Sequence, residues 1–142
     1  MIIRDLMQQD VSQLSLLYEQ FWGDKSDLLK MKNELSIIKN ENRHIILVAE
    51  INEKVVGSVM GIVCRELYGD CKPFLIVENM IVNKEIRRSG VGKGLLSELE
   101  KRAKNINCTQ MILVTESDRI DACCFYEKYG FQKNNKGYKK KL

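Results

Sequence analysis

The sequence contains one proline, one histidine and one tryptophan in 142 residues. Nine glycines beside a single proline exclude a collagen-like chain and low-complexity disorder. No apolar run approaches the roughly 18 residues that cross a bilayer, because Gly57 and Gly61 interrupt the longest one, residues 55–64. Charged side chains at positions 4 and 5 stand where a signal peptide would begin its apolar segment. We therefore expect a soluble, cytoplasmic protein without a membrane partner, and a single domain over residues 1–142.

Cysteine and histidine usage argues against a disulfide framework and against a metal site. The five cysteines are an odd number, show no paired spacing and form no Cys-x-x-Cys motif. A structural zinc site needs four well-spaced soft ligands, and His44 is the only histidine. We therefore expect no metal and expect most cysteines to be buried free thiols, with a Cys–His nucleophile pair left open.

The net charge of +4 comes from 23 basic and 19 acidic side chains. Part of the excess lies in the last ten residues, at Lys133, Lys136, Lys139, Lys140 and Lys141. A solvated final strand is the preferred interpretation of this cluster, ahead of attraction to a polyanionic ligand. Acidic side chains are interleaved elsewhere, so we expect no nucleic-acid partner.

Hydrophobic periodicity predicts the element order β-α-α-β-β-β-α-β-α-β, an α/β domain with a mixed sheet covered by helices. Asp10 is predicted to cap the first helix in a capping box with Gln13, and Ser26 to cap the second. The remaining helices are expected to end near Lys104 and to span 122–129, before Gly130. Strands are expected at 2–6, 44–51, 55–67, 74–82 and 109–115, with a last strand or strand pair at 131–142.

Glycines mark the beginning of the helix that follows residues 74–82. Gly90, Gly92 and Gly94 allow a ligand to approach the backbone, and the free N–H groups of a helix start attract anions. Arg87 and Lys93 add positive charge for phosphate oxygens. The spacing fits neither a P-loop nor a Rossmann turn. The segment favours another phosphate-bearing ligand, with a glycine-rich helix start that binds nothing as the alternative.

Two motifs carry a resemblance to a known family. Arg87-x-x-Gly90-x-Gly92, between an apolar strand and an amphipathic helix, resembles the pyrophosphate motif of the GNAT family of acyl-CoA-dependent N-acetyltransferases. Ala122-x-x-Phe125-Tyr126-Glu127-x-x-Gly130-Phe131 resembles the family's C-terminal helix and the strand that follows it. With the element order, the resemblance covers essentially the whole chain. It implies the GNAT fold, a mixed and mostly antiparallel sheet with splayed central strands flanked by helices.

The resemblance also implies acetyl-CoA as cosubstrate, held where the fourth and fifth strands splay apart. The backbone of Met80, Ile81 and Val82 is expected to hydrogen-bond the pantetheine arm, and an amide near Met80 or Ile81 to stabilise the oxyanion. The pyrophosphate is expected to lie against Arg87, Arg88, Ser89, Gly90, Val91, Gly92 and Lys93. Arg119 stands where many members carry an asparagine that contacts the cofactor. Arg119 is a candidate to bind a phosphate or an acidic substrate, and the alternative is a side chain that simply lies in solvent.

Glu78 and Tyr126 are the candidate catalytic residues. A partly desolvated Glu78 with a raised pKa could take a proton from the acceptor amine, directly or through a water. The alternative is a simple ion pair with Arg4 or Lys72. Glu78 and its neighbour Asn79 can share a site only if the strand bulges there. The resemblance implies Tyr126 as the acid that protonates the leaving thiolate, against the alternative of an ordinary core tyrosine.

The implied activity is acetyl transfer from acetyl-CoA to a primary amine by direct attack in a ternary complex. Arg119-x-x-Ala122-x-x-Phe125-Tyr126 and the lysine-rich end resemble branches that act on small molecules such as aminoglycosides. The acceptor pocket is expected from aromatic and acidic residues: Phe21, Trp22, Asp24, Asp27, Glu34, Tyr68 and Asp70. Acetylation of a protein amine and a catalytically idle CoA-binding regulatory module are the alternatives. An edge strand at the C-terminus would offer a route to a homodimer.

Overall fold

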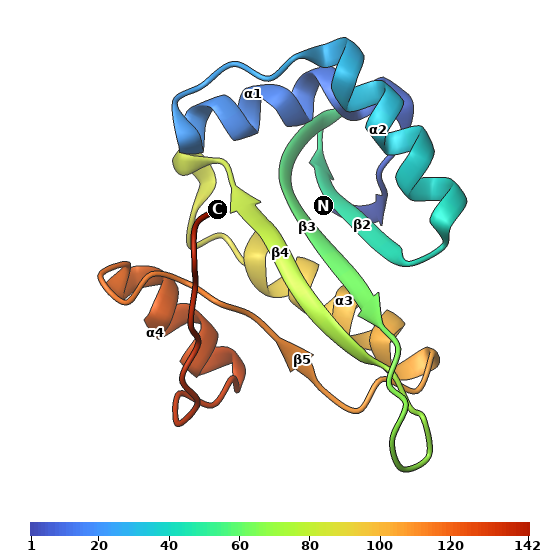
Figure 1. The fold of residues 1–142 in the computed structure, drawn as a ribbon. Coiled ribbons are helices and arrows are strands. Elements are labelled where there is room, and N and C mark those ends of the chain that lie inside the picture. The colour runs from blue at the N-terminus through green and yellow to red at the C-terminus, as the bar shows by residue number, and fades with distance from the viewer. The chain divides into compact units, whose positions relative to one another are not determined.

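The computed structural model describes residues 1–142, which divide into two compact units, 1–112 and 113–142. The first unit holds a five-stranded sheet with three α-helices, and the second holds one α-helix and an extended C-terminal segment (Figure 1). None of these helices combines the length and apolarity that a membrane span requires. The single domain expected over 1–142 stays a prediction.

The sheet has the strand order β1-β2-β3-β4-β5. Strands β1 (Ile2–Asp5), β2 (His44–Ile51), β3 (Lys54–Cys64) and β4 (Phe74–Val82) pair with one another in antiparallel fashion, and β5 (Met111–Ile112) is parallel to β4. Asn52 and Glu53 both have positive φ angles, which is the backbone a tight two-residue hairpin between β2 and β3 requires. The predicted fold class, a mixed and mostly antiparallel sheet flanked by helices, is therefore confirmed.

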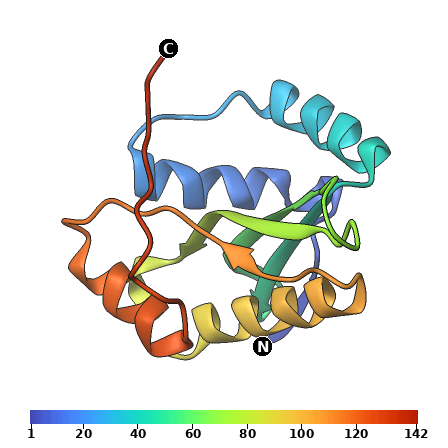
Figure 2. The same ribbon diagram turned by 60° about the horizontal axis from the view of Figure 1, so that its bottom comes forward.

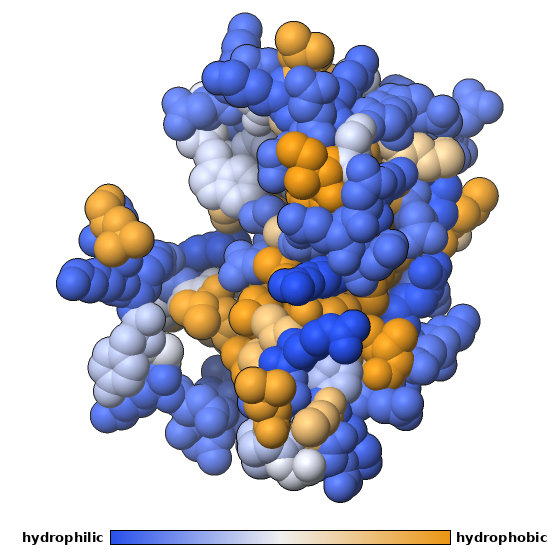
Figure 3. Space-filling view, turned by 45° about the vertical axis from the view of Figure 1, so that its right-hand side comes forward, coloured by the Kyte–Doolittle hydropathy of each residue, from blue (hydrophilic) through white to orange (hydrophobic).

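Helices cover both faces of this sheet (Figure 2). Helices α1 (Val11–Trp22) and α2 (Leu28–Glu41) lie on one face, and α3 (Val91–Asn105) lies on the other. On the α1 side, Leu14 and Leu17 are buried in a cluster with Ile81 of β4, as their helical spacing predicts. The outward face of α2 keeps Leu29 and Ile37 exposed, and apolar side chains appear among charged ones on this side of the molecule (Figure 3).

Helix α3 packs against the sheet through the apolar stripe that the sequence predicts. Val91, Leu95, Leu99 and Ala103 are all buried. A Cβ atom at Gly57 of β3 would lie 3.0 Å from the Ile81 carbonyl oxygen and 3.0 Å from Val91 Cγ1. The glycines that interrupt the apolar run of β3 are therefore what lets the first turn of α3 approach the sheet this closely.

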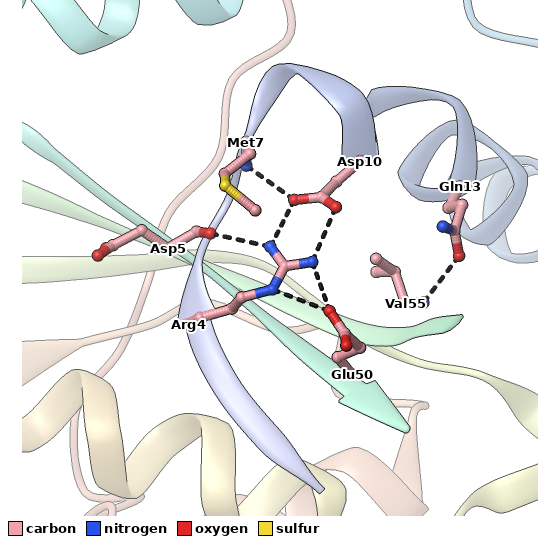
Figure 4. A network of polar contacts seen from close by, with 7 residues as sticks. All are labelled: Arg4, Asp5, Met7, Asp10, Gln13, Glu50 and Val55. Carbon is pink, nitrogen blue, oxygen red and sulfur yellow. Dashed lines mark hydrogen bonds and ion pairs between the residues drawn. The ribbon is translucent and has the colours of Figure 1, made fainter. Parts of the chain in front are cut away.

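Asp10 is the N-cap residue of α1, as predicted, but the predicted capping box is wrong because the Asp10 and Gln13 side chains bond elsewhere. The buried Asp10 carboxylate accepts hydrogen bonds from the Arg4 guanidinium at 2.6 and 2.9 Å, and Arg4 also donates to Glu50 at 2.6 Å (Figure 4). Gln13 Oε1 accepts the Val55 N–H at 2.8 Å. For the second helix, Asp27 rather than Ser26 is the N-cap, since its side chain accepts two backbone N–H groups of the first turn.

Two strand predictions for the second half of the chain are also wrong. The strand expected at 109–115 is only Met111–Ile112, and residues 131–142 form no strand. Residues 132–142 are all exposed and strongly basic, so they bury no apolar face that would pin them to a sheet. The edge-strand route to a homodimer therefore loses its basis. The five cysteines are free, as expected, but none is fully buried: three are half-buried and two exposed.

Candidate functional site

The unpaired edge of β4 is the first element of the candidate site. β4 pairs with β3 along its length but with β5 only at Leu75 and Ile76, so β4 and β5 splay apart after two residues. Within residues 1–112, the rest of β4 has no strand on its β5 side. The Asn83 N–H donates to the Val56 carbonyl of β3 at 2.8 Å. Because backbone groups alternate along a strand, the N–H and C=O of Val82 point to the open edge.

A β-bulge lies in the middle of this strand. Ser58 is opposite Ile81 and Met60 is opposite Glu78, so β4 has one residue more than β3 between these pairs. Asn79, inside the bulge, has a φ of +50°. The bulge that the sequence required for a site at Glu78 and Asn79 is therefore present.

The bulge decides which way Glu78 faces. Glu78 and Ile81 are three residues apart and would lie on opposite faces of an unbroken strand. Their partners on β3 are only two residues apart, so both side chains lie on the same face. Ile81 packs into the cluster under α1, which puts Glu78 on the α1 face of the sheet.

The Glu78 carboxylate is exposed, so the expected partial desolvation is wrong. The bulge carries it to a part of the sheet face that leaves the carboxylate open to solvent. The alternative ion pairs are not formed either. Arg4 bonds Asp10 and Glu50, and Lys72 Nζ lies 3.8 Å from Asp70 Oδ2. Glu78 is thus an accessible carboxylate rather than a partner in a structural ion pair.

The segment after β4 is held by helix α1. Gln20 Oε1 accepts the Lys84 N–H at 3.1 Å, and Gln20 Nε2 lies 3.5 Å from Asn83 Oδ1. The same Asn83 oxygen accepts the Glu85 N–H at 3.0 Å and opens a short 3-10 helix, η2 (Lys84–Ile86). Sequence reasoning missed Gln20, because a single glutamine on a helix carries no signal of the loop that it contacts.

The beginning of α3 is an uncapped helix N-terminus. Gly90 is the N-cap residue, has a φ of +88° and offers no side chain to the first turn. The first backbone bond of the helix runs from the Gly94 N–H to the Gly90 carbonyl at 2.9 Å. The N–H groups of Val91, Gly92 and Lys93 precede it and have no acceptor within the helix. Together with the helix dipole they favour an anion here.

Side chains around this helix start add positive charge. Arg87 and Arg88 are exposed, and Arg87 Nε lies 3.5 Å from the Val82 carbonyl oxygen, which joins the loop to the open edge of β4. Ser89 Oγ donates to the Ile86 carbonyl at 2.6 Å. Val91 is 1% exposed, so only its backbone can reach a ligand. An open strand edge followed directly by a cationic helix start suits a long ligand with amides at one end and phosphates at the other.

Comparison with known proteins decides the family. Residues 10–131 match the family model described as acetyltransferase (GNAT) family. The chain belongs to the GNAT acetyltransferase family. It is 34% identical over 85 residues to the uncharacterized protein YdhI of Bacillus subtilis (strain 168). That match covers 59% of this chain and 48% of YdhI, so it spans about half of the relative.

Solved structures agree with the GNAT assignment at the level of the fold. A putative acetyltransferase from Agrobacterium tumefaciens str. C58 superposes with a TM-score of 0.93 at 22% identity, covering 100% of both chains. Glucosamine-6-phosphate N-acetyltransferase from Arabidopsis thaliana gives a TM-score of 0.89 at 20% identity, covering 99% of this chain and 97% of that one. At such identities the likeness establishes the GNAT fold alone.

The second GNAT-like motif lies in the unit 113–142. Helix α4 (Ile120–Tyr129) ends at Gly130, whose φ of +118° confirms the predicted left-handed stop. Tyr126 is half-buried in the second half of α4, and its ring lies edge-on to Phe131 at a centroid distance of 5.8 Å. Arg119 is exposed at the N-cap position, with its guanidinium 3.5 Å from Thr115 Oγ1. The cofactor and acid roles of Arg119 and Tyr126 stay predictions.

The residues expected to form the acceptor pocket are not all available for it. The Asp27 side chain caps α2, and Asp70 lies beside Lys72. Phe21 and Trp22 form an aromatic group at the end of α1, with ring centroids 4.8 Å apart. Trp22 is about half exposed, so this group is open to solvent on one side.

Proposed function

We propose that this GNAT-family protein transfers an acetyl group from acetyl-CoA to the primary amine of a small molecule, by direct attack in a ternary complex. The observation that carries the proposal is the continuity of the open β4 edge with the uncapped, arginine-flanked start of α3. Amide groups on a pantetheine arm complement the free backbone groups of a strand edge. A pyrophosphate complements unsatisfied helix N–H groups and guanidinium side chains.

The donor side of the site is assigned to backbone and charged groups of two adjacent segments. We assign the pantetheine arm to the backbone of the segment Met80, Ile81 and Val82, whose open-edge amides stabilise negative charge on the thioester oxygen. The Ile81 side chain is buried and its own carbonyl faces β3, so the direct contacts fall to its neighbours Met80 and Val82. Residues Arg87 through Lys93 hold the pyrophosphate, and Arg119 contributes a further cation. Bound acetyl-CoA supplies the activated acetyl group as a thioester.

On the acceptor side, Glu78 accepts a proton from the acceptor ammonium, directly or through a water. The amine must lose this proton before its lone pair can attack the thioester carbon. The carboxylate is exposed on the α1 face and forms no ion pair with Arg4 or Lys72, so it is accessible for this step.

Tyr126 acts at the other end of the reaction. Its phenol donates a proton to the CoA sulfur as the carbon–sulfur bond breaks, so that CoA leaves as the thiol. The support for this role is the Phe125-Tyr126 motif and its position on α4 before a glycine stop, within the matched family region.

Release of free CoA from acetyl-CoA, measured across a panel of primary amines, tests the proposal. We expect at least one amine to stimulate release, and Glu78→Gln to lower kcat for that amine by about 10²-fold or more. Glu41→Gln, which neutralises an exposed carboxylate at the end of α2, is the matched control and leaves kcat unchanged. If CoA raises the Tm but no amine stimulates release, the chain is a CoA-binding module without turnover and the proposal fails.

A further inference from the structure

A buried hydroxyl without a hydrogen-bond partner lies next to the β4 bulge. Ser58 of β3 is 1% exposed, and its Oγ atom makes no hydrogen bond. Folded proteins satisfy nearly all buried polar groups, because leaving one unpaired costs free energy. An alanine would fill this position on an otherwise apolar strand face at lower cost. The serine therefore calls for an explanation other than packing.

The group that faces Ser58 is the phenol of Tyr18, on helix α1. Burial raises the pKa of Tyr18, and the Ser58 hydroxyl offsets part of that rise. The phenol therefore stays neutral and hydrogen-bonding at physiological pH. The Tyr18 ring packs edge-to-face on Trp22, with centroids 5.1 Å apart and planes 77° apart. The pair Tyr18–Trp22 forms one side of the aromatic group at the end of α1.

Strand register puts these groups on the same face as the candidate base. Ser58 is opposite Ile81 and Met60 is opposite Glu78, and residues two apart on β3 share a face. Ser58, covered by Tyr18, is thus the next position along the α1 face from Glu78. A half-buried phenol, an unpaired hydroxyl and an open carboxylate follow one another on this face.

We propose that Tyr18 binds the acceptor amine and that Ser58 positions its phenol. When the amine binds, the Ser58 O–H donates to the Tyr18 oxygen, and that oxygen accepts a second hydrogen bond from the acceptor's ammonium group beside Glu78. The rings of Tyr18 and Trp22 offer their faces to the same cation. This assignment rests on the proposed function, and it names the acceptor's binding group as a primary ammonium.

Trp22 is the chain's only tryptophan, so it reports on this subsite without any turnover. Amine binding can be followed by Trp22 fluorescence in the presence of saturating CoA, which carries no acetyl group to transfer. The probes are glucosamine 6-phosphate, kanamycin, spermidine and lysine. We expect a saturable change with at least one of them, and a Kd about tenfold higher in Tyr18→Phe. Tyr138→Phe, which alters an exposed tyrosine in the C-terminal segment, leaves the Kd unchanged.

Ser58→Ala distinguishes a positioning role from a structural one. Because the hydroxyl has no partner at ordinary hydrogen-bond geometry before the amine binds, its removal is expected to hold or raise the Tm of the amine-free protein. The same variant is expected to weaken amine binding by about threefold, and to have no further effect when combined with Tyr18→Phe. A serine with only a structural role would lower the Tm and leave the Kd for the amine unchanged.

The two proposals fail in different ways. An unchanged Kd in Tyr18→Phe, or turnover of a probe amine without any change in Trp22 fluorescence, overturns the subsite and leaves the acetyltransferase activity standing. A saturable, Tyr18-dependent fluorescence change without CoA release from acetyl-CoA supports the subsite and overturns the proposed transfer. Loss of Tm in Ser58→Ala together with an unchanged Kd overturns the positioning role of Ser58.

Discussion

Replacing Asp10 by asparagine is expected to destabilise the protein strongly and in a pH-dependent way. The Asp10 carboxylate is 2% exposed and accepts three hydrogen bonds, two from the Arg4 guanidinium and one from the Met7 N–H at 2.8 Å. An asparagine keeps one acceptor oxygen, but its NH₂ group faces an Arg4 N–H group, donor against donor. The side chain stays similar in volume, so the substitution isolates charge and hydrogen bonding from packing.

The size of the destabilisation depends on how completely the Arg4–Asp10 ion pair is shielded from solvent. Removing one partner of a fully buried pair costs about 3–5 kcal/mol. Arg4 has a side-chain exposure of 25% and keeps its bond to Glu50, so solvent and the second carboxylate offset part of this loss. We therefore expect Asp10→Asn to lower the free energy of unfolding by about 2–3 kcal/mol, or the Tm by roughly 5–12 °C.

The pH dependence has a definite sign. The Arg4 guanidinium, hydrogen-bonded to Asp10, holds the pKa of that carboxyl below its usual range. A group with a lowered folded pKa contributes stability above its unfolded value of about 4, and this contribution is lost as the pH falls through the folded value. The difference in free energy of unfolding between wild type and Asp10→Asn is therefore largest near neutral pH and becomes smaller below about pH 4.

Urea unfolding followed by circular dichroism, repeated from pH 7 down to below about pH 4, measures this difference in free energy of unfolding directly. Asp24→Asn is the matched control, because Asp24 is exposed in the loop between α1 and α2. It is expected to change the free energy of unfolding by less than about 0.5 kcal/mol. If Asp10→Asn lowered the free energy of unfolding by the same amount at every pH, stabilisation by the ionised Asp10 carboxylate would be refuted.

Three further predictions concern the donor site and its support. Gly90→Val should reduce the rise in Tm that CoA produces, while Gly69→Val, at another positive-φ glycine with open space around it, should leave that rise unchanged. Tyr126→Phe should lower kcat by roughly 10²–10⁴-fold with little change in CoA affinity, and wild-type kcat would remove its acid role. Gly57→Ala should destabilise the protein by about 1–3 kcal/mol in thermal unfolding, because its Cβ would press on Ile81 and Val91; an unchanged Tm would contradict this packing.

Elements with strong periodicity could be predicted from the sequence, and elements defined by distant contacts could not. The bounds of β2 and β4 agree with the predicted ranges, since both strands are mostly apolar and lie between turn residues. The position of the N-cap at Asp10 is as predicted, but its capping hydrogen bond is absent because the carboxylate bonds Arg4 of β1, a contact that local spacing does not encode.

The candidate site likewise has features that local sequence predicts and features that only distant contacts create. The glycines and arginines of the helix start are local signals, and the structure keeps them together at the beginning of α3. The exposure of Glu78 depends on how α1 lies over the sheet, and the Gln20 and Ser58 contacts join segments about 60 and 40 residues apart. Such contacts become visible only when the chain is folded, so a single sequence offers no pattern for them.

One extra residue in β4 explains how the two substrates of a transfer reaction can meet on a single strand. Backbone groups of β4 point along the sheet, and past Ile76 those on the β5 side meet no neighbouring strand of the first unit, which suits a donor bound through its amides. Side chains point out of the sheet, and the bulge at Asn79 turns Glu78 toward the α1 face, where Tyr18 and Trp22 lie. The donor and the acceptor therefore use perpendicular directions of the same strand. An unbroken β4 would place Glu78 on the face opposite Ile81 and α1, and would separate the base from the aromatic group that we assign to the amine.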